Sequence, residues 1–204
     1  MRIARRLFGP SRKEIWLKLS EEVNGRFVEG GFLGRDKVEV EHGGWTLTLD
    51  TYVVSTGKVI LTFTRMRAPY VNPDGFRFTV YRKSIFSGLG KLLGMQDIEI
   101  GDPPFDEGFI VKATDEPAVR MLLANATIRD LLSKQKDIQL VVKDDEGWFG
   151  TKFPEGVDEL YFVTGGTITD IDRLKLLYDL FAETLDELCR IGAASRTPPD
   201  VRVK

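Results

Sequence analysis

The chain has 204 residues, of which 42% are hydrophobic and 29% charged, so it is long and apolar enough to fold around a core of its own. Its single cysteine excludes an intramolecular disulfide and is typical of a reducing compartment, and its formal net charge of -2 argues against nucleic acid as a partner. The first residues lack the continuous apolar stretch of a signal peptide or a spanning helix, so we expect a cytoplasmic protein without a transmembrane segment.

The N-terminal region predicts one helix followed by one strand. Ser11 and Glu14 have the spacing of a capping box, which places the helix start at Ser11. Asn24 and Gly25 are typical of a left-handed helix stop. A strand is predicted from Arg26 to Leu33, where glycines indicate a bend.

Residues 37–80 predict four β-strands, because hydrophobic and polar side chains alternate along them. Turns separate the strands at Gly43 and Gly44, at Ser55 to Lys58 and at Asn72 to Gly75. Strands joined by short turns pair in chain order, so we expect an antiparallel meander with one buried face. A brief helix is predicted next, from Ser84 to Leu93.

The segment from Gly94 to Leu132 joins two halves of the chain. It predicts an extended run at residues 97–100, a bend at Pro103 and Pro104, and a strand at residues 109–113. Thr114 or Asp115 then caps a helix.

That helix is expected to break near Asn125, and Thr127 has the position of a cap for the next helix. A second set of strands is predicted from Ile138 onward, and it closes at Leu160 to Val163.

The last predicted element is the longest helix. It is capped at Thr169 or Asp170, carries a broad apolar stripe and stops at Gly192. Residues 193–204 contain two adjacent prolines and little to bury, so we expect a flexible tail there.

These elements predict an α+β fold in which antiparallel β meanders pack against helices. We expect a single globular domain over residues 1–192, with similar halves at 11–93 and 94–192 that could join into one curved sheet holding the long C-terminal helix. The layout resembles helix-grip folds, which is an analogy of fold alone.

The acidic segment at residues 97–107 is the one cluster that could carry chemistry. Asp97, Asp102 and Asp106 could bind a hard cation or divide into a general acid and a general base. Their spacing does not fit an EF-hand, and carboxylates on a solvated strand edge give the same pattern. Both interpretations stay open.

A basic group complements this segment. If the third and fourth strands pair through the Asn72 to Gly75 turn, Arg65 and Arg67 come to lie opposite residues 77–83, which include Arg77. Such a patch could meet a phosphate or a carboxylate, or it could pair internally with the acidic segment.

Other motifs carry no site. Ser55 to Lys58 is similar to the end of a phosphate-binding loop, but it lacks the first glycine and sits between strands, so we interpret it as a turn. His42 is the only histidine, which excludes a multi-histidine metal site. A cysteine and histidine pair would require Cys189 to meet His42, whereas Cys189 has the position of a helix core residue.

The strand from Phe105 to Val111 and the leucine-rich helix after it, with Leu122, Leu123 and residues 128–132, resemble a bacterial protein family of unknown function. The similarity spans Gly94 to Val163. The resemblance implies no activity and no functional residues, and members of that family are often anchored in a membrane by preceding helices.

The sequence therefore predicts a non-catalytic binding or protein-interaction module, with a protein or a small ligand as partner and no cofactor, metal or catalytic residue. Its tentative contact surface consists of Asp97, Asp102, Asp106, Arg65, Arg67 and Arg77. Two alternatives remain, a metal- or carboxylate-dependent hydrolase that uses residues 97–107 and a carrier of a small apolar ligand.

Overall fold

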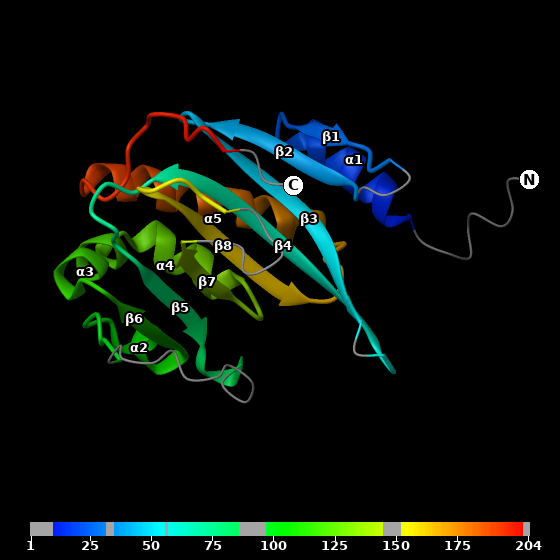
Figure 1. Cartoon of the computed structure of the whole chain (residues 1–204). Coiled ribbons are helices and arrows are strands. Elements are labelled where there is room, and N and C mark those ends of the chain that lie inside the picture. Colours follow the sequence, from blue (N-terminus) through cyan, green and yellow to red (C-terminus); the bar gives the residue numbers. More distant parts are fainter. Residues whose placement is uncertain (1–9, 32–34, 56, 86–96, 145–151, 202–204) are drawn as a thin grey trace, which may run out of the picture.

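The computed structural model describes residues 10–31, 35–55, 57–85, 97–144 and 152–201, which form one antiparallel sheet and the helices packed on it (Figure 1). The eight strands lie in the order β1-β2-β3-β4-β8-β7-β5-β6. Their bounds are β1 Arg26–Val28, β2 Lys37–His42, β3 Trp45–Ser55, β4 Ile60–Val71, β5 Phe78–Arg82, β6 Phe109–Ala113, β7 Gln139–Lys143 and β8 Val157–Gly165.

The helices are α1 Arg12–Glu22, α2 Pro103–Gly108, α3 Glu116–Ala124, α4 Ala126–Lys134 and α5 Ile171–Arg190, and a 3-10 turn, η2, covers Lys83–Ile85. α5 packs against α1, α3 and α4 on one side of the sheet. The α+β prediction with a long C-terminal helix is confirmed.

The core lies between the sheet and these helices. A row of paired residues crosses the sheet on this face, from Val38 through Leu49 and Met66 to Phe162 and Leu140. All five are buried. α5 is tied to this layer by the Tyr178 hydroxyl, which donates to the Val38 carbonyl oxygen at 2.9 Å.

Local signals placed several elements correctly. Ser11 and Glu14 form the capping box of α1, and Asn24 takes a φ of 51° at its end. Gly43 and Gly44, with φ of 58° and 102°, turn β2 into β3. Positive φ at both central positions is what a tight two-residue hairpin requires.

The predicted four-strand meander is wrong at its last step. β4 pairs with β8 over eight residue pairs, and β5 lies on the far side of β7. The loop after β4 is not a hairpin, because the Asn72 side chain binds both backbone groups of Phe76 and its amide donates to the Asp158 carboxylate. These bonds lead the chain away from β4 toward β5.

The strand order also does not follow the two expected halves, residues 11–93 and 94–192. β5 belongs to residues 11–93, yet it pairs with β6 and β7, which both belong to residues 94–192. A boundary after residue 93 therefore does not divide the sheet into two units.

Two helix starts differ from the sequence prediction. The expected bend at Pro103 and Pro104 is the first turn of α2, whose cap is Asp102. Proline is compatible with this first turn of α2, because no backbone hydrogen bond is lost there. At the second start, Asn125 and not Thr127 caps α4, since the Asn125 side-chain oxygen accepts from two backbone amides. Of the helix expected at residues 84–93, only residues 84–85 are described, within η2.

The first residues of the segment expected as a flexible tail, 193–196, are held against the sheet. Ala193 and Ala194 are buried, and Ser195 bonds to Val71 on β4 through its amide and to the Trp45 indole through its carbonyl oxygen. The Arg196 guanidinium lies over the Trp45 ring. These contacts hold the C-terminal segment beside the β2–β3 hairpin.

This packing predicts that substitution by alanine lowers the stability of the fold more at Gly44 than at Gly57. A Cβ at Gly44 would lie 2.5 Å from the Arg196 carbonyl oxygen, whereas a Cβ at Gly57, also at positive φ, has no atom within 4 Å. We expect Gly57→Ala to cost about 1 kcal/mol and Gly44→Ala at least about 2 kcal/mol more, measured by urea denaturation. Equal losses would contradict the packed position of the C-terminal segment.

Candidate functional site

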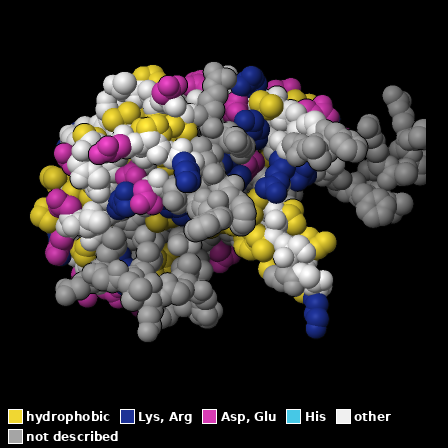
Figure 2. Space-filling model, viewed as in Figure 1, with side chains coloured by type: hydrophobic (Ala, Val, Ile, Leu, Met, Phe, Trp, Pro, Cys, Tyr) yellow, Lys and Arg dark blue, Asp and Glu magenta, His cyan; other side chains and the backbone are white. Residues whose placement is uncertain are grey.

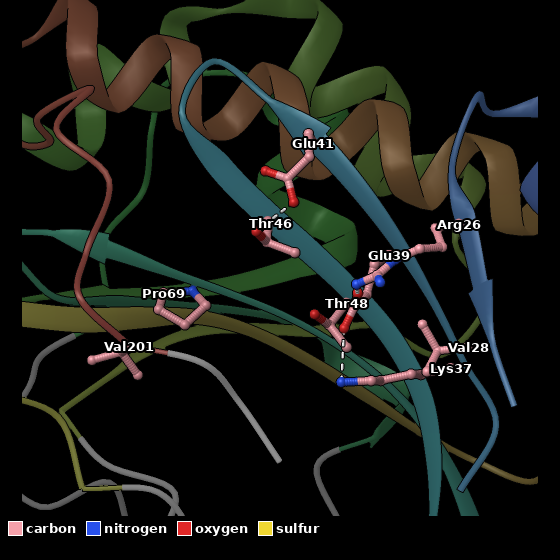
Figure 3. A pocket seen from close by; sticks show the side chains of 9 residues that line it. All are labelled: Arg26, Val28, Lys37, Glu39, Glu41, Thr46, Thr48, Pro69 and Val201. Carbon is pink, nitrogen blue, oxygen red and sulfur yellow. Dashed lines mark hydrogen bonds and ion pairs between the residues drawn. The ribbon is translucent and has the colours of Figure 1, made fainter. Parts of the chain in front are cut away.

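A cavity of 320 Å³ opens on the sheet face that turns away from the core, between the first strands and the C-terminal segment (Figure 3). We call this face the outer face and the cavity the groove. The groove is lined by Arg26, Val28, Lys37, Glu39, Glu41, Thr46, Thr48, Pro69 and Val201.

Strand register places these side chains together. Glu39 lies opposite Thr48, and Glu41 lies opposite Thr46, on neighbouring strands. Since alternate residues of a strand point to the same face, all four side chains stand on the outer face. Figure 3 shows Pro69 and Val201 on the other side of the groove from these strands.

The charges along the groove are arranged as pairs. Glu39 is held by Lys37 at 2.7 Å and by Arg26. Burial raises the pKa of Glu39, but the hydrogen bonds from Lys37 and Arg26 outweigh it, so this pKa is lowered overall. The Thr46 hydroxyl donates to the Glu41 carboxylate at 2.7 Å.

Thr48 differs from its neighbours. Its side chain is buried, and its hydroxyl oxygen has no hydrogen-bond partner in the part of the chain that the structure describes. A buried hydroxyl that loses its water without gaining a partner destabilises the fold by roughly 1–3 kcal/mol. Groups of this kind in native proteins call for an explanation, and a ligand that supplies the missing hydrogen bond is one.

Next to Thr48 on the outer face lies a charged triad of Asp50, Arg65 and Arg67. Arg67 lies opposite Thr48, and its guanidinium donates to Asp50 at 2.8 Å. Arg65 binds the same carboxylate through two hydrogen bonds of 2.6 and 3.0 Å. The two planar guanidinium groups fix the orientation of this carboxylate.

The expected contact surface is therefore only partly assembled. Arg65 and Arg67 lie together, because both bind Asp50. Arg77 lies elsewhere, at 2.9 Å from Asp144 and 3.3 Å from Asp158. β4 pairs with β8, so the expected pairing of residues 65–67 with 77–83 is wrong. The acids that pair with these arginines lie outside residues 97–107.

The carboxylates of the acidic segment, residues 97–107, make structural contacts. Asp106 accepts from the backbone amides of Ile100, Gly101 and Asp102. Asp102 caps α2 and pairs with Arg129 at 2.9 Å, and Asp97 pairs with Lys112 at 3.2 Å. Among the described residues, no group of three or more Asp, Glu, His and Cys side chains is placed to hold a metal ion.

His42 and Cys189 have separate partners. The His42 ring bonds to Asp186 at 2.8 Å and stacks on Trp45. The Cys189 thiol donates to the Ala194 carbonyl oxygen at 3.2 Å. Burial raises the pKa of Cys189, which keeps the thiol protonated and is the opposite of what a nucleophile needs.

Sequence reasoning missed the groove. The alternation predicted one buried face for these strands and assigned no site to Glu39, Glu41, Thr46 and Thr48 on the other face. The alternation does place these four on one face, which was the available signal. Pro69 and Val201 come from distant parts of the chain, so the walls that turn this face into a groove left no local pattern.

A scan against protein-family models finds no match, and no curated protein matches either. A search of solved structures finds the crystal structure of the mycobacterial trehalose monomycolate transport factor A, TtfA. The similarity covers 93% of this chain and 98% of that chain, with a TM-score of 0.51 and 8% sequence identity. At this identity the match supports the fold alone.

Within the described residues, no helix is long and apolar enough to cross a membrane.

The ion pairs of Glu39 predict a dependence of stability on pH. A lowered carboxyl pKa contributes stability above the ordinary value of 4.5, and this contribution is lost as the pH falls through the folded-state pKa. We expect Glu39→Gln to be less stable than the wild type by about 1 kcal/mol at neutral pH and equally stable in acid. Urea denaturation across pH measures both.

Glu21, which is exposed on α1, provides the control. Glu21→Gln should change the unfolding free energy little at any pH. A Glu39→Gln difference that is the same in acid as at neutral pH would contradict the ion-pair explanation.

Proposed function

We propose that this chain is a non-catalytic binding protein that holds a small, hydroxyl-rich polar ligand in the groove. The observation that carries the proposal is the buried Thr48 hydroxyl, which has no hydrogen-bond partner among the described residues and lies in the groove lining. A ligand that bonds to this hydroxyl would remove the desolvation penalty that the empty groove retains.

The other lining groups support the ligand class. Arg26 and Lys37 donate hydrogen bonds, whereas the carboxylates of Glu39 and Glu41 accept them. A sugar hydroxyl both donates and accepts, so it can bond to alternating donors and acceptors without bringing a charge. Because Arg26 and Lys37 are already paired with Glu39, and the lining residues carry two cations and two carboxylates, a neutral ligand fits this lining better than an ion does.

The structural neighbour agrees with this class. TtfA is named as a transport factor for trehalose monomycolate, a compound that contains the disaccharide trehalose. At 8% identity it cannot transfer a ligand to this chain, but it makes trehalose the first sugar to test. His42 and Cys189 bond to different partners and do not form a nucleophilic pair. This agrees with a role in binding or transport, which requires no catalytic pair.

The test is a ligand panel with a matched pair of variants. The panel contains trehalose, other disaccharides, free amino acids and inorganic phosphate, and binding is measured by thermal shift and by calorimetry. A ligand that binds only the folded state raises the melting temperature, and the increase grows with the logarithm of the ligand concentration above its Kd. We expect the disaccharides to shift it and phosphate to leave it unchanged.

Thr48→Val removes the hydroxyl and keeps the shape. We expect it to raise the stability of the free protein by about 1 kcal/mol and to weaken sugar binding about tenfold. Thr184→Val is the control, because the Thr184 hydroxyl on α5 is also buried without a partner among the described residues but does not line the groove. It should gain stability and keep its affinity.

Two results would contradict the proposal. One is a panel in which no sugar shifts the melting temperature of the wild type. The other is a sugar that binds Thr48→Val as tightly as the wild type, since the ligand would then sit elsewhere. Turnover of sugar esters by the purified protein would replace the binding function with a hydrolytic one.

A further inference from the structure

The two longest strands extend beyond the rest of the sheet as a hairpin arm, residues 52–55 and 57–63. β2 stops pairing with β3 at Asp50, and β8 stops pairing with β4 at Thr64. Beyond these positions β3 and β4 pair with each other, from Tyr52 opposite Phe63 to Ser55 opposite Ile60. Figure 1 shows this arm projecting away from the body of the molecule.

The arm is apolar where a soluble surface would be polar. Its exposed large hydrophobic side chains are Val53, Val54, Val59, Ile60 and Leu61, five of the seven that are exposed in the described ranges. Ile60 has 74% of its surface exposed. Figure 2 shows hydrophobic side chains gathered over the arm. Contiguous apolar exposure of this kind marks an interaction site.

The exposed side chains occupy both faces of the arm. Val53 and Val54 are consecutive residues of β3, and Ile60 and Leu61 are consecutive residues of β4. Successive side chains of a strand point to opposite faces, so each face carries residues of this set. A protein partner that packs on one face of the arm leaves the hydrophobic side chains of the other face in water. An apolar medium contacts the hydrophobic side chains of both faces.

Charge and aromatic content favour a lipid surface as that medium. The chain has no acidic residue between Asp50 and Asp74, and Lys58 lies in the turn at the tip of the arm. Cations near a membrane are attracted to anionic lipids. At the base of the arm, Tyr52 and Phe63 stack with ring centroids 5.1 Å apart, and Arg65 lies over Tyr52. Tyrosine rings and arginines are typical of the headgroup level of a bilayer.

We infer that the arm binds the surface of an anionic lipid bilayer, with its aliphatic tip in the headgroup boundary and the Tyr52 and Phe63 pair at the water side. A two-stranded ribbon cannot pair the backbone groups of its outer edges internally, which restricts insertion to the wet interface. This binding is independent of the groove, which lies on the outer face of the sheet proper.

The experiment is sedimentation of the full chain with phosphatidylcholine vesicles, prepared with and without phosphatidylglycerol. We expect binding to the mixed vesicles and about fivefold weaker binding of Lys58→Gln. The double change Ile60→Ser and Leu61→Ser should weaken binding at least about tenfold, because two aliphatic side chains no longer enter the apolar layer.

The matched control changes two exposed hydrophobic residues outside the arm, Leu17→Ser on α1 and Met121→Ser on α3, and should keep wild-type binding. A tryptophan in place of Ile60 should show a blue-shifted emission on vesicles. The inference is overturned if the wild type does not sediment with mixed vesicles, or if the Ile60 and Leu61 variant sediments as well as the wild type. It is also overturned if size-exclusion chromatography shows self-association that this variant abolishes, since a second copy would then occupy the arm.

Discussion

The rest of the structure depends on the pairing of β4 with β8. Eight residue pairs, from Thr64 and Thr164 to Val71 and Val157, join two strands that are about ninety residues apart in the chain. Because β3 occupies the other edge of β4, β5 has no place beside it and pairs with β6 and β7 instead. One continuous sheet results. It offers an apolar face to α5, and on its outer face β2 and β3 present the polar side chains of the groove.

On the outer face, two carboxylates are each bound by two cationic side chains. Asp50 lies between Arg65 and Arg67, and Glu39 lies between Arg26 and Lys37. Ion pairs of this kind contribute little net stability, because desolvation opposes the Coulombic gain. Their effect is to fix orientation. The groove therefore presents ordered donors and acceptors, and the Thr48 hydroxyl is the lining group for which the described residues provide no partner.

The same register that builds the sheet also exposes the arm. β3 and β4 are longer than the strands that flank them, so in the described part of the chain no third strand pairs with residues 53–55 and 60–61. Ile60 lies on the same face of β4 as the core residue Met66, and here it faces solvent. Groove and arm thus follow from one arrangement. The groove forms where strands are crowded by the C-terminal segment, and the arm forms where two strands continue alone.

The sequence by itself determined the local elements. The capping box at Ser11, the Gly43 and Gly44 turn, the strand at residues 109–113 and the stripe of α5 are set by interactions within a few residues, so their patterns are visible in the chain. It also determined the α+β class. Only the tertiary structure decided which strands are neighbours, that Ser195 and Arg196 contact Trp45, and that Arg65 and Arg67 share Asp50 while Arg77 does not. Strand order, groove walls and buried ion pairs depend on contacts between distant residues, and those contacts are selected by the packing of the whole core rather than by any local pattern.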